Sequence, residues 1–582
     1  MSRGGVEMTW KTTYETGGNF EDLETNLKEE LVSLAENEKM LEDAFYAPLE
    51  FGTAGMRGVL GVGVNRMNIY TVRQATEGLA RFMDSLGEET KKRGVAIAFD
   101  SRHQSPEFAM EAAKTLGAHG IPSYVFESLR PTPELSFAVR FKNAYAGIMI
   151  TASHNPAEYN GYKVYGEDGG QMPPKEADAL TEYVRGIKNS LTIDVLSEED
   201  LKKSNLLTIL GEDVDAPYLE LVKTVTVNSD LVKDMSKEMK LVFTPLHGTG
   251  QMLGERALKN AGFASISVVP EQAIPDPNFP TIKSPNPEEH SAFEYAIRLG
   301  EKENADVLVA TDPDADRLGI AVKVPAGHYE VLSGNQIASL MLHYLLTAQK
   351  EAGTLPSNGV VLKSIVSSEL ATAIAKSFSI KMVDVLTGFK FIAEKIKQYE
   401  MDHTQTFLFG FEESYGYLVK PFVRDKDAIQ ALVLVAEVAA FYKKQGKTMY
   451  DGLQDIYATY GYYEEKTISV TLAGIEGSAK IKALMAKFRE EAPIEFAGIS
   501  VASMEDFDAS QRIYSDGKVE IIDMPAANVL KYSLADGSWI AIRPSGTEPK
   551  IKFYIAAVAS SAVEVDKKVV EFEKTIQTLI NA

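Results

Sequence analysis

The chain has 582 residues, of which 45% are hydrophobic and 24% are charged, as in an ordinary water-soluble globular protein. At about 150 residues per domain, this length predicts roughly four domains. The formal net charge of −22 argues against general nucleic-acid binding, because phosphate backbones need clusters of positive charge. The chain has no cysteine, which excludes disulfides, thiolate catalysis and zinc–thiolate sites.

The N-terminal stretch, MSRGGVEMTWKTTYE, lacks an apolar core of signal-peptide length. The longest apolar stretch, Ala428–Tyr442, is too short to cross a bilayer and contains Gln430 and Glu437. We therefore predict a buried helix there, and we expect a cytoplasmic protein without a membrane partner.

Short apolar, mostly β-branched runs recur along the first three quarters of the chain. Each is followed by a polar loop, and we expect a helical stretch after the loop. The predicted strands are Val95–Phe99, Ala146–Ile150, Leu241–Phe243, Val307–Ala310, Val360–Leu362, Met382–Val385 and Thr406–Phe409. This alternation predicts α/β layers with mostly parallel sheets, in which ligands bind at the loops beyond the strand ends. Asp100-Ser101-Arg102 follows the first of these strands.

The last ~120 residues have a different pattern, with closely spaced strands and turn signals such as Asp536-Gly537. The predicted strands are Thr467–Leu472, Val519–Ile522, Val529–Leu534, Trp539–Arg543 and Lys550–Val558. We predict three similar mixed-sheet α/β domains in series and a smaller C-terminal α+β domain. Polar breaks place their bounds at 1–210, 211–325, 326–455 and 456–582.

The segment Asp312-Pro313-Asp314-Ala315-Asp316-Arg317 follows a predicted strand. Three carboxylates so close together repel one another unless a cation lies among them, and an all-oxygen cluster suits Mg²⁺. An EF-hand is excluded, because its sixth position is Arg317 and its twelfth is Lys323. The alternative is a solvated acidic turn that caps a helix. Arg317 favours the metal site, because a cation beside the ion can hold a phosphate.

The segment Arg543-Pro544-Ser545-Gly546-Thr547-Glu548-Pro549-Lys550 can form a nest of N–H groups around an anion, with Arg543 binding phosphate. The alternative is a plain turn between strands. A Walker A loop is excluded at Gly446-Lys447-Thr448, because the required earlier glycine is Phe441. Gly248-Thr249-Gly250 matches a dinucleotide-binding fingerprint only weakly, since the third glycine comes one place late.

The segment Gly410-Phe411-Glu412-Glu413-Ser414-Tyr415-Gly416 also follows an apolar strand. Its carboxylates and hydroxyl can bind neighbouring sugar hydroxyls; the alternative is an acidic helix N-terminus. By itself, the segment Arg424–Asp427 is typical of a solvated charge run.

Ser153 lies in the loop Thr151-Ala152-Ser153-His154-Asn155-Pro156 after another predicted strand. A single loop serine is usually a cap or a turn, and we expect adjacent Ser and His side chains to diverge rather than form a triad. The G-x-S-x-G elbow is absent from this loop. The three other loops favour a catalytic serine over a cap or turn, because together they supply the groups that phosphoryl transfer needs. A serine beside Mg²⁺ can then carry the phosphoryl group covalently.

These four loops, in this order, resemble those of the α-D-phosphohexomutase family, on the branch that includes phosphopentomutase-like members. Thr387-Gly388-Phe389-Lys390 and the segment Phe51–Gly58 (FGTAGMRG) also match family segments, so the resemblance runs from about residue 45 to 560. It implies three similar α/β domains and a smaller fourth domain around one cleft.

The resemblance also implies roles for individual residues. Ser153 would be phosphorylated, and its phosphate would bind Mg²⁺ with Asp312, Asp314 and Asp316. Glu412 and Ser414 would bind sugar hydroxyls, with Lys390 also on the substrate. The non-transferring phosphate would bind Arg543, Ser545, Gly546 and Thr547. Arg57 and Lys163 would lie near the transferring phosphoryl group and Lys426 near the substrate. Lys163, Lys426 and His154 are the alternatives for the general acid and base. Some family members have a histidine after the sugar-binding serine, where this chain has Tyr415.

The implied reaction interconverts glucose 1-phosphate and glucose 6-phosphate through a phosphoserine and glucose 1,6-bisphosphate, so small sugar phosphates are the expected partners. The alternatives are activity on pentose or mannose phosphates, hydrolysis of sugar phosphates, and a catalytically silent binding protein. Intact Ser153, the three aspartates and Arg543 argue against the silent protein. The sequence leaves the oligomeric state open.

Overall fold

A computed structural model describes residues 10–52, 55–472, 474–545 and 550–581. The chain forms two compact units. The first unit comprises Met1–Leu332, Ala393–His403 and Ser414–Gly446, and the second comprises Ser333–Ile392, Thr404–Glu413 and Lys447–Ala582. Across the described ranges, the structure contains no helix with the length and apolarity needed to cross a bilayer.

The first unit begins with a six-stranded mixed sheet in the order β1-β5-β4-β2-β3-β6. Strands β4, β2, β3 and β6 pair in parallel. Strand β5 pairs antiparallel with β4, and β1 pairs antiparallel with β5. Their bounds are β1 Gly55–Val59, β2 Val95–Phe99, β3 Ser123–Phe126, β4 Ala146–Ile150, β5 Tyr159–Tyr165 and β6 Leu207–Leu210. The helices are α1 Trp10–Gly18, α2 Thr25–Leu34, α3 Glu38–Phe45, α4 Ile69–Leu86, α5 Glu88–Arg93, α6 Ser105–Ala118, α7 Thr132–Phe141, α8 Pro174–Arg185 and α9 Glu198–Lys203. Helices α6 and α7 pack on this sheet, and α4 packs on α6 and α8.

A second mixed sheet in the same unit has the order β11-β10-β9-β7-β8. Strands β8, β7 and β9 pair in parallel. Strand β10 pairs antiparallel with β9, and β11 pairs antiparallel with β10. The strands are β7 Leu241–Thr244, β8 Ile266–Val268, β9 Val307–Thr311, β10 Leu318–Lys323 and β11 Tyr329–Val331. The helices are α10 Glu212–Val222, η1 Lys223–Val225, α11 Ser229–Met235, α12 Gly250–Ala261, α13 Pro270–Ala273, η2 His290–Phe293, α14 Glu294–Glu303 and α18 Ala428–Lys444. Helix α18 is the predicted buried helix and packs on β9, β10, α11 and α12.

The second unit contains a third sheet, in which β12 pairs in parallel with β13 and β14. The strands are β12 Gly359–Ser364, β13 Lys381–Val385 and β14 Thr406–Glu412, and the chain then continues to β15 Gly416–Leu418, which belongs to the first unit. The helices of this unit are α15 Gly334–Glu351, α16 Glu369–Ser377 and α19 Met449–Tyr460. Helix α17 Phe389–Asp402 begins in this unit and belongs to the first unit from Ala393 onward.

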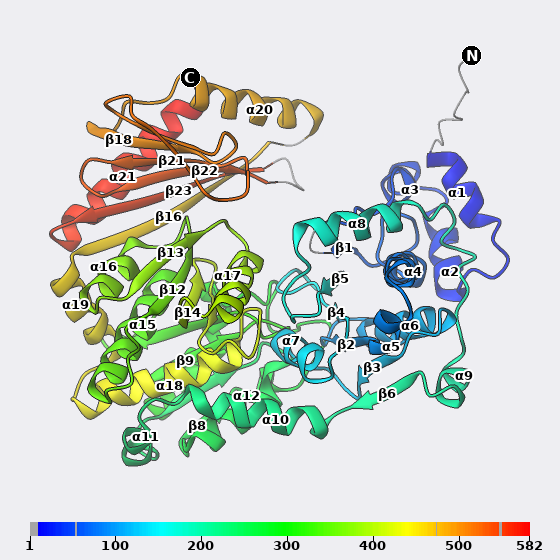
Figure 1. The fold of residues 1–582 in the computed structure, drawn as a ribbon, viewed down its shortest axis with the longest axis horizontal. Coiled ribbons are helices and arrows are strands. Elements are labelled where there is room, and N and C mark those ends of the chain that lie inside the picture. The colour runs from blue at the N-terminus through cyan, green and yellow to red at the C-terminus, as the bar shows by residue number, and fades with distance from the viewer. Residues whose placement is uncertain (1–9, 53–54, 473, 546–549, 582) are drawn as a thin grey trace. The chain divides into compact units, whose positions relative to one another are not determined.

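The C-terminal sheet of the second unit is antiparallel, in the order β16-β23-β22-β21-β18-β19-β20 (Figure 1). Its elements are β16 Tyr462–Thr471, α20 Gly474–Glu490, β17 Glu495–Phe496, β18 Ile499–Asp506, β19 Gln511–Tyr514, β20 Val519–Ile521, β21 Leu530–Leu534, β22 Trp539–Pro544, β23 Lys550–Ala559 and α21 Ala562–Asn581. Both faces of the central strand β22 are buried. Ile540 and Ile542 pack with helices α20 and α21, and the alternate residues Trp539 and Ala541 pack against Ile365.

The predicted fold class is confirmed: three α/β domains with mixed sheets are followed by a C-terminal domain built on an antiparallel sheet. The prediction that a helix follows each loop is wrong after β14, where strand β15 comes next, and it is wrong at two site loops of the first unit. The loop after β4 leads to antiparallel β5, and the loop after β9 leads to antiparallel β10. The apolar strand Leu318–Lys323 completes the second sheet, where it is buried. Each loop is therefore a hairpin, which brings its two ends close together.

Candidate phosphoryl-transfer site

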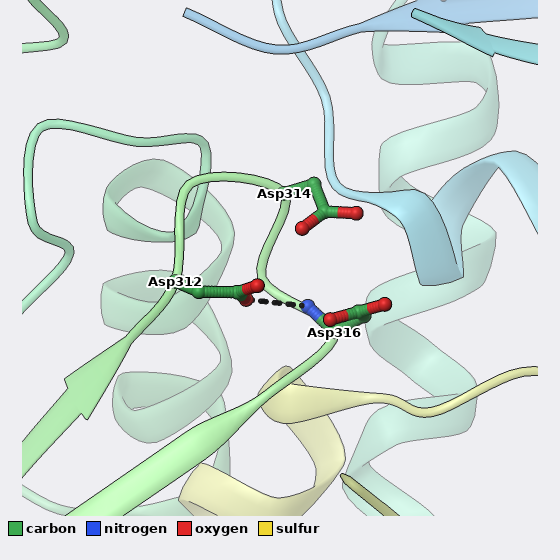
Figure 2. A group of neighbouring side chains, drawn as sticks. All are labelled: Asp312, Asp314 and Asp316. Atoms are coloured by element: carbon green, nitrogen blue, oxygen red, sulfur yellow. Dashed lines mark hydrogen bonds between the residues drawn. The ribbon is translucent and has the colours of Figure 1, made fainter. Parts of the chain in front are cut away.

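The loop of residues 312–317, which carries the three aspartates and is called the aspartate loop below, joins β9 to β10 as a tight hairpin (Figure 2). Oδ1 of Asp312 accepts hydrogen bonds from the backbone N–H groups of Asp316, at 3.2 Å, and Arg317, at 3.1 Å. Ala315 adopts the left-handed conformation with φ 50°. These local bonds explain how aspartates two residues apart all come to line one side of a loop.

All three aspartates are buried, at 0% exposed for Asp312 and Asp314 and 2% for Asp316, so the predicted alternative of a solvated acidic turn is wrong. One oxygen from each lies within 4.8 Å of the others. Burial, and then the charges of Asp314 and Asp316, raise the pKa of Asp312 well above its usual range. Among the described residues, Oδ1 of Asp314 and Oδ1 of Asp316 have no hydrogen-bond partner. Buried oxygens without donors are suited to holding a metal ion.

Two lysines from distant segments reach the same aspartates. Nζ of Lys163, on β5, lies 3.1 Å from Oδ2 of Asp314, and Nζ of Lys426 lies 3.3 Å from Oδ2 of Asp316. Burial is the largest single effect and opposes ionisation of Asp314, but the Lys163 cation and the hydrogen bonds to this carboxyl together outweigh it and lower its pKa. The site therefore combines clustered negative charge with two cations at its edge.

The charge run at 424–427 is buried, so the interpretation as a solvated run is wrong. Each charge has a partner that the sequence did not indicate. Arg424 binds Glu400, Asp425 accepts from Tyr165 at 2.7 Å, Lys426 contacts Asp316, and Asp427 accepts from Tyr218 and caps α18. This network fixes Lys426 beside the aspartates.

Ser153 reaches the aspartate loop from the first sheet. Its Oγ donates to Oδ2 of Asp312 at 2.9 Å, across 159 positions of sequence. The expectation that Ser153 and His154 diverge is wrong, because Oγ lies 3.4 Å from Nδ1 of His154. Ser153 has φ 52°, and this left-handed backbone turns both side chains toward one space. Burial, and then the Arg317 and Arg57 charges, lower the pKa of His154 to about 2, so its imidazole is neutral.

Two arginines lie near the serine and aspartate loops. Arg57 on β1 donates to Oδ1 of Asn155 at 2.7 Å and keeps an exposed side chain. Arg317 donates to Glu288 at 3.1 Å and to the backbone oxygen of Ser414 at 2.9 Å. This contact brings Ser414, which belongs to the first unit with the next two residues of the predicted sugar loop, to the aspartate loop.

Thr132, at the start of α7, belongs to this site, but no sequence signal marked it. Its hydroxyl donates to Oδ2 of Asp314 at 2.7 Å, and its N–H donates to the backbone oxygen of the same residue at 2.9 Å. Only the packing of the first two sheets brings it there.

The glycines at 248 and 250 serve packing rather than a dinucleotide. A Cβ on Gly248 would lie 2.4 Å from Cα of Pro313, and one on Gly250 would lie 2.6 Å from the hydroxyl of Thr311. These glycines therefore allow the loop after β7 to lie directly against the aspartate loop.

In the second unit, Glu412 ends β14 and is 5% exposed. The next residue, Glu413, accepts from Ser364 at 2.7 Å. The alternative of a helix N-terminus at this segment is wrong, because it ends one strand, β14, and precedes another, β15. Lys390, in the first turn of α17, is half-buried.

The predicted phosphate loop lies between β22 and β23 of the second unit. The N–H of Ser545 donates to the backbone oxygen of Lys550 at 2.7 Å. Burial, and then the charge of Glu413, raise the pKa of Tyr554 to about 12, and its hydrogen bond with Arg543 opposes this rise. Arg543 and the Glu413 carboxylate therefore lie near the same tyrosine. Gly546 and Thr547 lie outside the described residues.

The predicted residues are divided between the two units, and contacts bring together those of the first unit. The group in the first unit is Arg57, Ser153, His154, Lys163, Asp312, Asp314, Asp316, Arg317, Ser414 and Lys426. The second unit contains Lys390, Glu412, Arg543 and Ser545, and of these Glu412 and Arg543 both lie near Tyr554.

Models of four consecutive domains of one family match the chain in order. They are described as phosphoglucomutase/phosphomannomutase alpha/beta/alpha domain I at residues 48–190, domain II at 216–326, domain III at 333–460, and the C-terminal domain at 498–572.

Curated relatives and solved structures agree with these matches. A phosphoglucomutase of Staphylococcus aureus (strain USA300) is 40% identical over 531 residues, which cover 90% of this chain and 93% of the relative. Two structures share the fold. A phosphoglucomutase/phosphomannomutase family protein from Burkholderia thailandensis has a TM-score of 0.64 at 18% identity, covering 91% of this chain and 97% of its own. The pp63/parafusin phosphoglucomutase from Paramecium has a TM-score of 0.67 at 18% identity, covering 92% and 95%.

Proposed function

Because the chain belongs to the phosphoglucomutase/phosphomannomutase family, we propose that it interconverts glucose 1-phosphate and glucose 6-phosphate through a phosphoserine and a glucose 1,6-bisphosphate intermediate. The observation that carries the proposal is the 2.9 Å contact between Ser153 and Asp312, because it sets a hydroxyl nucleophile beside three buried carboxylates. The relatives named phosphoglucomutase support glucose as the sugar.

The residues that would hold Mg²⁺ are Asp312, Asp314 and Asp316, with an oxygen of the Ser153 phosphate. Their donor atoms are all oxygens, which suits this hard ion, and two of these oxygens are buried without donors among the described residues. When bound, Mg²⁺ supplies charge neutralisation for the phosphoryl group.

In the proposed transfer, the bond from phosphorus to Ser153 Oγ breaks as a bond to a sugar hydroxyl oxygen forms, and that hydroxyl loses its proton. Lys163 and Lys426 lie beside the aspartates, so their charges can meet the phosphoryl oxygens. The neutral His154, 3.4 Å from Ser153 Oγ, is placed to accept a proton. Lys163 and Lys426 are the alternatives for that role, and Arg57 and Arg317 would flank the phosphoryl group.

The remaining predicted residues would bind the rest of the sugar phosphate. Glu412 and Ser414 would accept and donate hydrogen bonds to sugar hydroxyls, with Lys390 also on the substrate. Arg543, Ser545, Gly546 and Thr547 would bind the phosphate that is not being transferred. The same residues must serve both orientations of the bisphosphate, because each phosphate in turn is the one transferred.

The test is a coupled assay for glucose 6-phosphate, starting from glucose 1-phosphate, with and without added glucose 1,6-bisphosphate. We expect turnover that rises when the bisphosphate is supplied. Release of inorganic phosphate without glucose 6-phosphate would instead identify a phosphatase. Mannose 1-phosphate and ribose 1-phosphate are run in parallel, and a preference for ribose above about tenfold would identify a phosphopentomutase.

Ser153→Ala removes the proposed nucleophile and should lower kcat by at least ~10⁴-fold, because the covalent route is lost. Ser85→Ala, which removes a hydroxyl bonded only to its own helix at Phe82, is the control and should keep full turnover. Near-normal turnover in Ser153→Ala with the bisphosphate supplied would show that another residue carries the phosphoryl group.

A further inference from the structure

A buried arginine that the proposed chemistry does not use contacts the backbone of the serine loop, which follows β4 and carries Ser153. Arg102 follows β2 and is 1% exposed. One terminal nitrogen donates to the backbone oxygens of Pro156, at 2.8 Å, and Tyr159, at 3.0 Å. The other donates to the backbone oxygens of Ser153, at 2.6 Å, and Asn155, at 2.5 Å. One side chain therefore holds four carbonyl groups of the segment 153–159.

Asp100 fixes this arginine and reaches the serine from its other side. Oδ2 of Asp100 lies 3.3 Å from Nε of Arg102 and accepts from the Thr151 hydroxyl at 2.6 Å. The same Thr151 oxygen accepts the N–H of Ser153 at 2.8 Å. The N–H and the carbonyl oxygen of Ser153 are thus both held, directly or through one hydroxyl, by the Asp100–Arg102 pair.

The backbone at Ser153 needs such support. Its φ of 52° lies in the left-handed region, which residues other than glycine adopt rarely and which persists only where the surroundings fix it. In this conformation Oγ faces Asp312, and Nδ1 of His154 lies close by. A relaxed loop would turn the hydroxyl away from both groups.

We propose that Arg102 is a positioning residue, which holds the loop 153–159 so that Ser153 Oγ stays in line for phosphoryl transfer. This inference rests on the proposed function. Arginine is required because its planar group offers donors in a fixed fork, whereas a lysine ammonium cannot reach four carbonyls spread along a loop. A shift of about 1 Å in a reacting atom lowers a rate by about 100-fold.

The test compares Arg102→Lys and Thr151→Val with the control Arg73→Lys. Arg73 is a largely buried arginine of α4, and within the part of the chain that the structure describes its side chain pairs with Glu111 at 2.6 Å and not with the serine loop. Three quantities are measured on folded protein: the split between kcat and KM for glucose 1-phosphate, the single-turnover phosphorylation of Ser153 by glucose 1,6-bisphosphate followed by intact-protein mass, and hydrogen–deuterium exchange in a peptide covering 151–160.

For Arg102→Lys we expect kcat and the phosphorylation rate to fall about 100-fold, KM to change less than about threefold, and exchange in the 151–160 peptide to rise. Thr151→Val should show the same pattern to a smaller degree, and Arg73→Lys should show none of it. An Arg102→Lys protein with kcat within about threefold of wild type overturns the proposal. So does a loss that Arg73→Lys shares, or a loss without faster exchange in the peptide.

The proposed function can fail separately. A wild-type protein without mutase turnover in the bisphosphate assay would reject the function. The exchange measurement would still decide whether Arg102 orders the loop, because it needs no substrate.

Discussion

The hydroxyl of Thr132 and the imidazole of His119 do not touch the reacting atoms, but we expect the first to affect metal affinity at this site and the second to affect the stability of its domain. Thr132 donates its hydroxyl to Oδ2 of Asp314 from a fully buried position. Groups that orient metal ligands in this way commonly change metal affinity when they are removed. His119, at the C-terminal end of α6, lies between Glu77 and Asp84.

Thr132→Val keeps the shape of the side chain and removes the donor, so Mg²⁺ should bind about 10–100-fold more weakly. Isothermal titration with Mg²⁺ alone measures this without substrate. The control is Thr115→Val, whose hydroxyl is equally buried but bonds only to the backbone of Glu111. Equal Mg²⁺ affinity in the two variants would show that Thr132 does not orient Asp314.

The stability that His119 contributes should depend on pH. The hydrogen bond to Glu77 first, and then that to Asp84, raise the pKa of His119 above its ordinary value near 6.5, against burial. A raised histidine pKa gives stability that is complete below the unfolded value and is lost as pH rises through the folded value. A charged histidine at a helix end contributes about 1 kcal/mol, or about 2–4 °C for a domain of this size.

His119→Gln should therefore lower the thermal midpoint most at pH 5.5–6.5, and the difference from wild type should shrink by pH 9. His328→Gln, at an exposed histidine beside Glu330, is the control and should show little difference at any pH. A gap for His119→Gln that widens with pH would reverse the sign of this argument.

At the scale of elements, the same device recurs: a parallel strand ends, a polar hairpin follows, and an antiparallel strand returns. The serine loop lies between β4 and β5 and the aspartate loop between β9 and β10. A neighbouring loop contacts each hairpin. In the first sheet Arg102 donates to the backbone of the serine loop, and in the second Gly248 lets the loop after β7 lie against the aspartate loop. The aspartate loop therefore depends on the close approach of the loop after β7.

Gly248→Ala should displace the aspartate loop, because the new Cβ would lie 2.4 Å from one backbone atom of Pro313 and 2.6 Å from another. We expect about 1–3 kcal/mol lower stability of the first unit and weaker Mg²⁺ binding. Gly166→Ala is the matched control, since its nearest atom would be 3.5 Å away. Unchanged Mg²⁺ affinity in Gly248→Ala would show that the loop adapts without cost.

At the scale of the whole molecule, the chain divides into two compact units, and all three aspartates belong to the first. A ligand that binds only folded protein stabilises the unit that holds it, by about 2.7 kcal/mol at a concentration 100 times its Kd. Each unit also contains one of the two tryptophans, Trp10 in the first and Trp539 in the second.

Mg²⁺ should therefore raise the thermal transition of the first unit and leave that of the second in place, and EDTA should reverse the shift. Fluorescence of a Trp539→Phe variant, which reports only on Trp10, follows the first unit, and Trp10→Phe follows the second. A shift seen only through Trp539 would place the ion outside the aspartate loop.

The amino-acid sequence by itself determined the local chemistry. Short apolar runs predicted many of the strands, among them Val95–Phe99 and Ala146–Ile150, because such runs are a local signal of buried strands. They did not predict the returning strands β5 and β10. The aspartate spacing predicted an oxygen-rich cluster, because repulsion among three adjacent carboxylates needs no knowledge of the fold. The order of the four loops indicated the family, which the domain matches confirm.

Only the tertiary structure decided which distant groups meet. Ser153 contacts Asp312 across 159 residues, and Thr132 reaches Asp314 across 182, because two separate sheets pack together. The burial of the 424–427 charges also depends on partners such as Tyr165 and Asp316 from other elements, so local composition suggested the opposite. Sequence spacing encodes contacts within a turn, but contacts between loops depend on packing that a local pattern does not record.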